Sequence, residues 1–501
     1  MAKYLLGADI GTGGCKVTIV DTEGSYVSGG FTEYPTHHPH PGWSEQTPED
    51  WLNALRCSLQ EALCKGGISP SDILGITLDA SAHNAVLLGN DGEILRPTIM
   101  WTDQRSSQEA LFLKEHYGDL IFKQTYNVPG ATWTLPQLLW IKRNEPDTFT
   151  HIRKIVFLKD YVRYMLTGCY STDHIEAQGS MLFDNTSWTW SKDLCSLLGL
   201  PYDCLPDIRK PLETVGYITQ EAASKMGLCA GTPVLAGASD TALELYSVGA
   251  VKQGDCVVKM ATAGAISLFR DKPCPDQKVF TYSHVADGIW YNCVGTNSGA
   301  QSYRWYRDVF CPTEKQAEDM GGENVYQLLD REASSIPVGA DSLIFSPYLN
   351  GERSPYWDPA LKASFVGITS QHERGHFSRA IMEGVAFSIR DNFERIVTED
   401  ENIQMVKFLG GGAKSPLWRQ ILADVLDKPI VKYERDDSSF GAALFTGVGI
   451  GVFPDHETAI SRANKVDSIT YPQPEAIDRY TDLFQTYKQI HDVLAPLYHK
   501  P

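Results

Sequence analysis

The first glycine-rich segment of the chain carries residue types that can bind phosphate. It reads Asp9-Ile10-Gly11-Thr12-Gly13-Gly14 and follows a short apolar run. Gly11 and Gly13 leave backbone N–H groups free of Cβ atoms, and Thr12 adds a hydroxyl. An aspartate that ends the preceding strand, here Asp9, can hold a magnesium ion, usually through water. The alternative is an ordinary tight hairpin with a structural aspartate. The absence of GxGxxG spacing disfavours a dinucleotide site.

A second candidate for chemistry is Asp240, in the segment Gly237-Ala238-Ser239-Asp240-Thr241. An aspartate between a buried strand and the start of a helix stands where α/β folds place their sites. The helix start favours the ionised carboxylate, which can then accept a proton from a hydroxyl. The alternative is an ordinary helix N-cap, a common role of aspartate. Spacing alone leaves both interpretations open.

A third glycine run, Gly410-Gly411-Gly412, precedes Ala413 and a helix start at Ser415-Pro416. Three successive glycines cost conformational entropy and indicate a close approach of another group to the backbone. A nucleotide can lie against such a flat surface. The sequence GxxxxGK[ST] is absent here, so this is not a Walker A loop. The alternative is a plain connection between a strand and a helix.

Two further segments carry groups that suit a sugar. They are Ala82-His83, within LDASAHNAVLL, and Trp101-Thr102-Asp103-Gln104-Arg105. Polar side chains can bind sugar hydroxyls, and an aromatic ring can cover a C–H face. For His83 alone, a histidine satisfied within its loop is the alternative. Three more histidines lie in a proline-rich loop, which favours solvation over metal binding: His37, His38 and His40.

The elements expected around these residues are of mixed α/β type. Runs rich in β-branched residues predict strands, and the first two are expected to form a hairpin. A Thr-Pro-Glu-Asp sequence at residues 47–50 predicts a helix start. The expected strands are 4–10, 16–21, 26–34, 73–80 and 234–237, and the expected helices are 47–64, 135–143, 160–166 and 241–248.

The opening pattern recurs in the second half of the chain. An apolar run at 256–260, a turn Ala261-Thr262-Ala263-Gly264 and a further run at 265–269 repeat the strand, small-residue turn and strand of residues 4–21. Such a repeat predicts two similar domains in tandem. The boundary is expected at 249–254. The second half continues with a helix at 374–397, a strand at 406–409, a helix at 415–426 and a C-terminal helix after 472.

Composition narrows the function classes. A chain of 501 residues has room for two large domains. Its net charge of −18 argues against non-specific binding of nucleic acid, which needs a basic surface. No secretory signal and no apolar run long enough for a membrane helix are found. The eleven cysteines never form CxxC, which favours reduced thiols and a cytoplasmic location.

Longer segments of the chain resemble the FGGY family of carbohydrate kinases. Leu349–Pro355 reads LNGERSP, Glu383–Phe387 reads EGVAF and is followed by Arg390-Asp391, and residues 410–426 read GGGAKSPLWRQILADVL. The last segment closely resembles the family's C-terminal signature. The resemblance runs from Asp9 to about Leu444.

Within the family, the overall pattern is most similar to the xylulose kinases. PGWSEQ at residues 41–46 and WTDQR at 101–105 fit that subgroup. One departure concerns the residues that face the sugar in the family, where Ala80-Ser81-Ala82-His83-Asn84 replaces the usual Gly-Gln-Met-His-Gly. The resemblance therefore implies D-xylulose as the first candidate substrate, with another pentulose, a polyol or a modified sugar as alternatives.

The resemblance also implies a fold and a set of roles. It implies two tandem actin-like, ribonuclease-H-like domains around a central cleft, with residues 1–248 on the sugar side and 249–501 on the nucleotide side. ATP and Mg²⁺ are the expected cofactors, the sugar and ATP the expected partners, and a homodimer is allowed for. The implied site residues are Asp240 as general base, Asp9 as the metal-linked acid, Gly11, Thr12, Gly13, Thr262 and Gly264 at the phosphates, Gly411, Gly412 and Ala413 at the adenine, and His83, Ala82, Trp101 and Asp103 at the sugar.

Two functions from other classes compete with a kinase. A non-catalytic sensor of similar fold could bind a sugar or nucleotide and report it to a partner, but it needs no general base. An ATP-driven chaperone should carry an additional peptide-binding β domain, and the tail after Ile450 is too short for a typical one. ADP release that depends on a sugar would distinguish a kinase from both.

Overall fold

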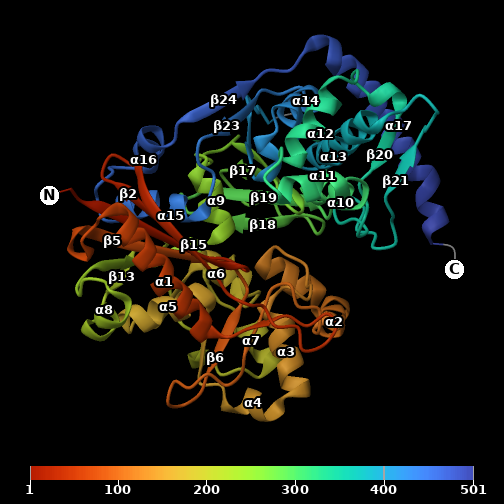
Figure 1. Ribbon diagram of the computed structural model, residues 1–501. Coiled ribbons are helices and arrows are strands. Elements are labelled where there is room, and N and C mark those ends of the chain that lie inside the picture. The colour runs from red at the N-terminus through yellow and green to blue at the C-terminus, as the bar shows by residue number, and fades with distance from the viewer. Residues whose placement is uncertain (1, 399–400, 500–501) are drawn as a thin grey trace.

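The computed structural model describes residues 2–398 and 401–499. These residues form two sheet-containing parts that face each other (Figure 1). The first part, red to yellow-green, lies below and to the left. The second, green to blue, lies above it, and the C-terminal helix runs along its outer side. None of the described helices has the length and apolar character needed to cross a membrane.

The first sheet has the strand order β13-β14-β5-β1-β2-β3, and β15 pairs with β5 beside this path. Strands β1, β2 and β3 form an antiparallel meander, whereas β5 runs parallel to β1, and β14 runs parallel to β5. The strands are β1 (Tyr4–Ile10), β2 (Gly14–Asp21), β3 (Tyr26–Glu33), β5 (Ile73–Ala80), β13 (Thr214–Tyr217), β14 (Pro233–Leu235) and β15 (Ala238–Ser239).

The second sheet has the order β18-β19-β17-β16-β22-β23-β24 and repeats this arrangement. β16, β17 and β19 form the antiparallel meander, and β22 and β23 continue in parallel. The internal repeat expected from the sequence is therefore confirmed. The strands are β16 (Cys256–Met260), β17 (Gly264–Arg270), β18 (Phe280–Ser283), β19 (Trp290–Thr296), β22 (Val406–Leu409), β23 (Ile430–Tyr433) and β24 (Val466–Thr470).

Helix α1 (Pro48–Gly66) shows how local sequence sets an element. Proline occupies the first helical position, Glu49 and Asp50 complement the helix dipole, and Gly67 ends the helix in the left-handed region with φ 61°. The apolar side of the helix packs on β2 and β3. The helix ends two residues later than expected, and Thr47 stands at the N-cap without a side-chain capping bond.

Two helices cross between the sheets. Helix α9 (Asp240–Ser247) follows the first sheet in sequence, yet its Leu245 packs with Val257, Phe269 and Tyr291 of the second sheet. Helix α15 (Ser438–Gly449) follows the second sheet in sequence but packs on β1, β2 and β5 of the first. In Figure 1, α15 and α16 are blue and lie beside the red strands. The two halves are thus joined through an exchanged pair of helices.

Close backbone packing accompanies this exchange. A Cβ atom at Gly7, in the middle of β1, would overlap the carbonyl oxygen of Ser439 and the nitrogen of Ala443 on α15. A Cβ at Gly441, on α15, would overlap the carbonyl oxygen of Leu243 on α9. Glycine at both positions lets the helix backbones approach their neighbours.

The remaining elements complete the two parts. In the first part several of them form a separate core that includes Trp133, Phe157 and Phe183, while the helices at 158–167 and 220–226 pack into the core of the first sheet. They are α2 (Ser107–Thr125), α3 (Thr134–Asn144), α4 (Pro146–His151), α5 (Leu158–Thr167), α6 (His174–Gly179), α7 (Lys192–Leu198), α8 (Gln220–Met226), and the short pairs β4 (Glu45–Gln46) with β7 (Thr98–Ile99), β6 (Ala85–Leu88) with β8 (Lys154–Phe157), β9 (Ser171–Asp173) with β12 (Asp207–Arg209), and β10 (Phe183–Asp184) with β11 (Thr189–Trp190).

In the second part, long helices cover the sheet face opposite α9. Buried residues of α13, among them Ile381 and Val385, join the core of that part. The elements are α10 (Ala300–Phe310), α11 (Pro312–Asp319), α12 (Val325–Ser334), α13 (Arg374–Ile396), α14 (Pro416–Leu426), α16 (His456–Ala463), α17 (Pro474–Tyr498), β20 (Ile344–Ser346) and β21 (Ser364–Val366). The long helix at 374–397 and the C-terminal helix after 472 are confirmed.

Candidate active site

Aspartates gather at the carboxyl edge of the first sheet, where Asp79 is buried and the others are half-buried. In the parallel register Asp9 of β1 is opposite Asp79 of β5, and Asp79 is opposite Ala238 of β15. Asp240 follows two residues later as the first residue of α9. Asp437, the N-cap of α15, adds a carboxylate that affects the pKa of Asp9. The sequence prediction named Asp9 and Asp240 but missed Asp79 and Asp437.

Burial governs the electrostatics of this cluster. Burial, and then the charge of Asp240, raises the pKa of Asp9 to about 7. The pKa of Asp79 is raised well above its ordinary value by burial and by Asp9. When both groups are ionised, the described residues offer no hydrogen-bond donor to either carboxylate oxygen of Asp79 or to Oδ1 of Asp9. A proton held on Asp79 and donated to Asp9 supplies the missing donor.

Asp240 is not the helix cap. The side chain of Ser239 stands at the N-cap of α9 and accepts from the Ala242 N–H. The Asp240 carboxylate instead accepts from the backbone N–H of Thr241 at 2.6 Å and from its hydroxyl at 3.2 Å. Burial raises the pKa of Asp240, while Lys259 and these two bonds oppose the increase. The carboxylate therefore keeps acceptor capacity for a substrate hydroxyl.

The first glycine turn is hydrogen-bonded to the loops that carry Trp101 and Gln46. Gly11 N–H donates to Gly14 O at 3.0 Å, which closes the β1–β2 hairpin. The Thr12 hydroxyl accepts from the indole N–H of Trp101 at 2.9 Å, and its carbonyl accepts from Gln46 at 2.7 Å. No atom lies within 4 Å of a Cβ built on Gly13. The backbone at Gly13 is therefore open to a ligand.

The second small-residue turn packs against the start of α10. The carbonyl of Thr262 accepts from the backbone N–H groups of Gly299 and Gln301, and its hydroxyl accepts from Arg304 at 3.1 Å. Gly264 pairs with Thr296 of β19 at the start of β17. Both hairpins thus stand at equivalent places in the two sheets, which is the arrangement the repeat predicted.

The third glycine run is only partly accessible. Residues 411–414 form a 3₁₀ turn between β22 and α14, and the side chain of Ser415 caps α14 as predicted. Gly411 is exposed and has free space around it. Gly412 and Ala413 are buried, and a Cβ on Gly412 would meet the side chain of Met260. Gly411 is the member of this group that presents an open surface.

His83 is fixed in one orientation. It has a φ of 74°, its backbone N–H donates to Glu176 at 3.0 Å, and its carbonyl accepts from the Thr134 hydroxyl at 2.9 Å. Nδ1 lies 2.5 Å from the Gly179 carbonyl oxygen and must donate to it. Burial lowers the pKa of His83 to about 4. The ring is therefore neutral, and its Nε2 can accept a hydrogen bond.

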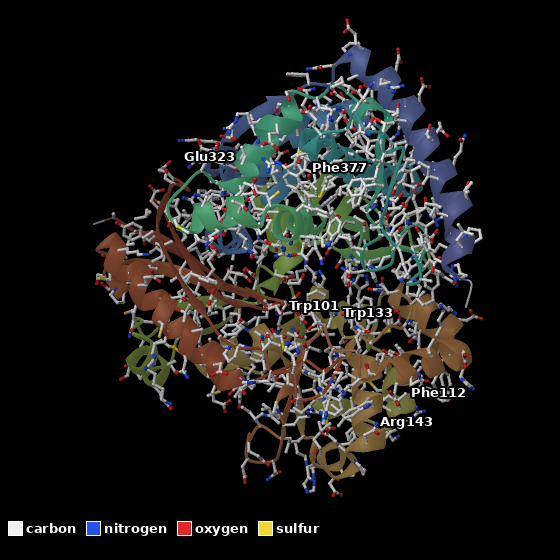
Figure 2. All side chains as sticks on the ribbon, turned by 45° about the vertical axis from the view of Figure 1, so that its right-hand side comes forward. Trp101, Phe112, Trp133, Arg143, Glu323 and Phe377 are labelled. Atoms are coloured by element: carbon white, nitrogen blue, oxygen red, sulfur yellow. The ribbon has the colours of Figure 1, made fainter. Side chains whose placement is uncertain are left out.

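The aromatic side chains near His83 come from two loops. The Trp133 ring centroid is 4.7 Å from that of His83. Trp101 is 41% exposed, and its backbone N–H donates to Asn84, which in turn bonds to Ser81. Figure 2 shows Trp101 and Trp133 where the two parts of the molecule meet. Ala82, which precedes His83 in the sequence, is half-buried.

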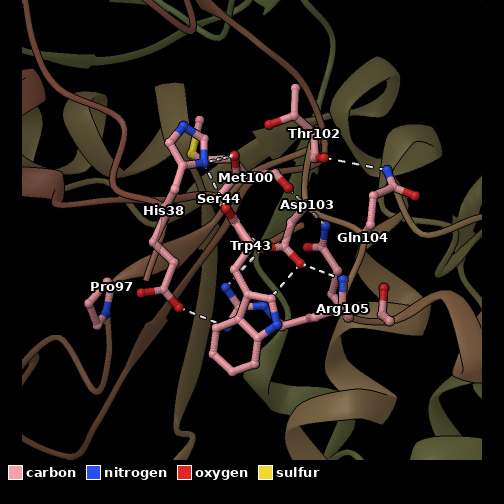
Figure 3. A network of polar contacts seen from close by, with 12 residues as sticks. His38, Trp43, Ser44, Pro97, Met100, Thr102, Asp103, Gln104 and Arg105 are labelled. Atoms are coloured by element: carbon pink, nitrogen blue, oxygen red, sulfur yellow. Dashed lines mark hydrogen bonds and ion pairs between the residues drawn. The ribbon is translucent and has the colours of Figure 1, made fainter. Parts of the chain in front are cut away.

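Asp103 has partners within the protein. Its carboxylate is fully buried and accepts from Arg105 at 2.8–2.9 Å and from the backbone N–H of Ser44 at 2.5 Å. Arg105 also lies over the Trp43 ring at 3.6 Å and bonds to Glu45 (Figure 3). Asp103 therefore joins the loop at 101–105 to the loop at 36–46, and its contact with the sugar stays a prediction.

The histidine-rich loop lies beside this network. His37, His38 and His40 are all exposed, as expected of a solvated loop. Nδ1 of His38 is 2.7 Å from the carbonyl oxygen of Trp43 (Figure 3). A shallow hollow of about 420 Å³ between this loop, Thr12 and Thr102 opens to solvent.

Glu176 is another residue of the candidate site that the sequence prediction missed. It is almost fully buried, and burial raises its pKa to about 8, while Lys159 opposes the increase. Lys159 itself is buried between Asp160 at 2.5 Å and Asp173 at 2.6 Å. The position of Glu176 beside the His83 N–H could be recognised only after residues 93 apart in sequence had been placed together.

The raised pKa of Glu176 predicts a pH dependence of stability. The folded state holds a proton that the unfolded state loses above the ordinary pKa of 4.5. The free energy of unfolding should therefore fall between about pH 4.5 and pH 8, by at most a few kcal/mol. In Glu176→Gln this slope should be smaller, so the variant should gain stability relative to the parent at pH 8. Urea unfolding at pH 5.5 and pH 8 measures the difference, and equal slopes would contradict the prediction.

Comparisons with known proteins identify the family. The pattern described as "FGGY family of carbohydrate kinases, N-terminal domain" matches residues 4–246, and that of the C-terminal domain matches residues 262–450. This chain belongs to the FGGY family of carbohydrate kinases. The match covers the range over which the sequence resembles the family, and it makes the protein a sugar kinase.

Individual relatives of this FGGY kinase match along its whole length. A xylulose kinase of Bacillus subtilis is 31% identical over 98% of this chain and 97% of its own. The crystal structure of a xylulose kinase from Brucella ovis superposes with a TM-score of 0.89, at 30% identity over 99% and 100% of the two chains. A gluconate kinase from Lactobacillus acidophilus has a TM-score of 0.90 at 27% identity, over 99% of both chains. The predicted actin-like, ribonuclease-H-like fold is confirmed.

Proposed function

We propose that this FGGY kinase phosphorylates D-xylulose to D-xylulose 5-phosphate with ATP as the donor. The observation that carries the proposal is the full-length similarity to a xylulose kinase, together with the placement of His83 three residues after β5 and of Asp240 directly after β15, two strands that pair in parallel. The neutral His83 ring and the Trp101 indole are suited to sugar hydroxyls and to the sugar's C–H face. The division into a sugar side, residues 1–248, and a nucleotide side, residues 249–501, belongs to this proposal.

The chemical step follows from the position of Asp240. The carboxylate accepts the proton of the substrate hydroxyl while the hydroxyl oxygen forms a bond to the γ-phosphorus. The bond from that phosphorus to the β–γ bridging oxygen breaks, and ADP leaves with the electron pair. Backbone N–H groups at Gly13 and the 262–264 turn bind the phosphates, Gly11 holds the first hairpin closed beside them, and Gly411 lies against the base.

Magnesium fits the carboxylates of this site. Burial, and then the charge of Asp240, raises the pKa of Asp9, and a divalent cation beside this carboxylate would oppose that increase. In the part of the chain that the structure describes, no group of three His, Cys, Asp or Glu side chains is placed to hold a metal. Asp9 would therefore hold Mg²⁺ mainly through water and phosphate oxygens. The ion would supply charge neutralisation at the phosphates.

The test is ADP release over a panel of neutral pentuloses, polyols and D-gluconate. We expect D-xylulose to give the highest kcat/KM. Gluconate is the second candidate, because a gluconate kinase superposes with a TM-score of 0.90 and Ser81 and Ala82 depart from the usual xylulose pocket. A preference for gluconate would replace xylulose as the substrate. No sugar-dependent ADP release from any compound would favour the non-catalytic sensor.

Two predictions about the protein's setting accompany this function. We propose a cytoplasmic location, which the eleven free thiols support, since all of them lie in the described residues and none forms a disulfide. The homodimer stays a prediction, and light scattering coupled to size-exclusion chromatography measures it. Neither affects the chemistry assigned to Asp240.

A further inference from the structure

We propose that Lys259 and Arg353 form a cationic cradle for the phosphoryl group in transfer, on the wall of the cleft formed by the second sheet. The inference rests on the proposed kinase reaction and adds two residues that contact the reacting group. Both side chains lie next to the second phosphate turn, and the sequence analysis assigned a role to neither.

The register of three neighbouring strands places the two cations. Lys259 on β16 is paired with Ala265 on β17, and Ala265 is paired with Gly295 on β19. These residues therefore form one row across the sheet, with about 4.8 Å between adjacent strands, and their side chains share a face. One further row, Met260 with Gly264 and Thr296, separates it from the turn, and that row faces the other side of the sheet. Ala265 and Gly295 have no side chain beyond Cβ, and a Cβ on Gly295 would overlap the carbonyl oxygen of Gly264.

Arg353 reaches this row from a separate loop. Its Nη2 lies 3.4 Å from the place where a Cβ atom on Gly295 would stand. The neighbouring Glu352 fixes the loop, because its carboxylate accepts from the Thr296 hydroxyl at 2.6 Å and from the backbone N–H of Asn297 at 2.8 Å. The guanidinium thus stands beside the end of β19, about two strand spacings from β16, the strand that carries Lys259.

The guanidinium of Arg353 lacks a protein partner. Within residues 2–398 and 401–499 its side chain makes no salt bridge and no hydrogen bond, and its Nε is buried without an acceptor. A buried N–H without an acceptor destabilises the protein, and more so when the group is charged. An anion that binds here would recover that energy.

Lys259 connects the row to the general base. Its Nζ bonds to Glu244 at 2.5 Å, and Glu244 lies one helical turn after Asp240 on the same face of α9. Burial lowers the pKa of Lys259, but the charges of Glu244, Asp240 and Asp9 outweigh burial, and the net shift is upward. The side chain is 38% exposed, so this cation is partly accessible to a ligand.

These two cations match the charge of the transferring group. In the step above, negative charge is spread over the three equatorial oxygens of the phosphoryl group. A guanidinium offers a planar pair of donors, and an ammonium offers a compact charge. Such groups stabilise this charge without taking part in bond formation. Lys259 keeps Glu244 as one acceptor, and among the described residues the Arg353 guanidinium has none.

The experiment compares Lys259→Met, Arg353→Met and Arg353→Lys with Arg331→Met, a surface control that removes the same charge from the exposed ion pair with Glu323. We expect kcat to fall at least about 10²-fold in both methionine variants at the cleft. The affinity for MgADP and the KM for the sugar should change less than about threefold, because neither ligand carries the transferring group. Arg353→Lys should recover part of the rate, and Arg331→Met should behave like the parent.

A second readout does not depend on turnover. Inhibition by orthovanadate, added with MgADP and the sugar, should weaken at least about tenfold in Arg353→Met, and calorimetric titration of inorganic phosphate should show the same loss. Unchanged kcat and unchanged phosphate binding in the methionine variants would overturn the cradle. A loss of activity that Arg353→Lys does not recover, and that is accompanied by a lowered melting temperature, would also overturn it. If the parent phosphorylates no sugar, the proposed function fails, and the phosphate titration still decides the cradle.

Discussion

Replacing Asp240 by asparagine should lower kcat by at least about 10²-fold, within the range of about 10²–10⁴ that a general base contributes. The amide has the same shape as the carboxylate but cannot take up the hydroxyl proton. Its oxygen can still accept from the Thr241 N–H, so helix α9 should keep its start. Sugar-dependent ADP release measures the loss. Asp240→Ala should lose at least as much.

The structure supplies a matched control for this substitution. Asp455 caps α16, is fully exposed to solvent, and lies outside the cleft, so Asp455→Asn should leave kcat unchanged. The pH profile gives a further check. Because burial raises the pKa of Asp240, the parent's kcat should fall as pH decreases through that pKa. The residual rate of Asp240→Asn should lack this decrease. A variant with the parent's rate would remove Asp240 from the reaction.

The sequence predicted those parts of the fold that depend on neighbouring residues. The hairpin of β1 and β2, its repeat in β16 and β17, and the strand at 73–80 follow from alternation, β-branched residues and glycine turns. Ser415 and Pro416 fix the start of α14 in the same local way. These signals lie within a few residues of each other, so folding does not alter them.

The site residues that the sequence analysis missed are brought to the site by contacts between distant parts of the chain. Asp79 meets Asp9 through parallel pairing of β1 with β5, and Glu176 meets His83 across 93 residues. Parallel pairing leaves no mark within either strand. Asp103 shows another limit of sequence reasoning, because its residue type suits a sugar, whereas its bonds to Arg105 and the Ser44 N–H became visible only in the fold. A polar side chain is available to a ligand only when the fold leaves it without partners.

Gly7→Ala should strongly destabilise the protein. The added Cβ would overlap backbone atoms of Ser439 and Ala443 and would lie 2.8 Å from the Ala442 Cβ. Backbone atoms of a helix cannot move aside as the end of a flexible side chain can. Overpacking typically costs about 1–3 kcal/mol and sometimes more, and here β1 and α15 must separate. We expect a loss of about 3 kcal/mol or more, measured by urea unfolding.

Gly118→Ala is the control that separates crowding from the loss of a glycine. Gly118 lies in α2 with no atom within 4 Å of its built Cβ, so alanine there should raise stability by about 0.5–1 kcal/mol. Gly7 stands two residues before Asp9, and α15 begins one residue after Asp437. Separation of β1 from α15 should therefore move both carboxylates, and kcat should fall together with stability. A Gly7→Ala protein as stable and active as the parent would show that α15 can shift without disturbing the site. The position of Asp9 would then not depend on the exchanged helices.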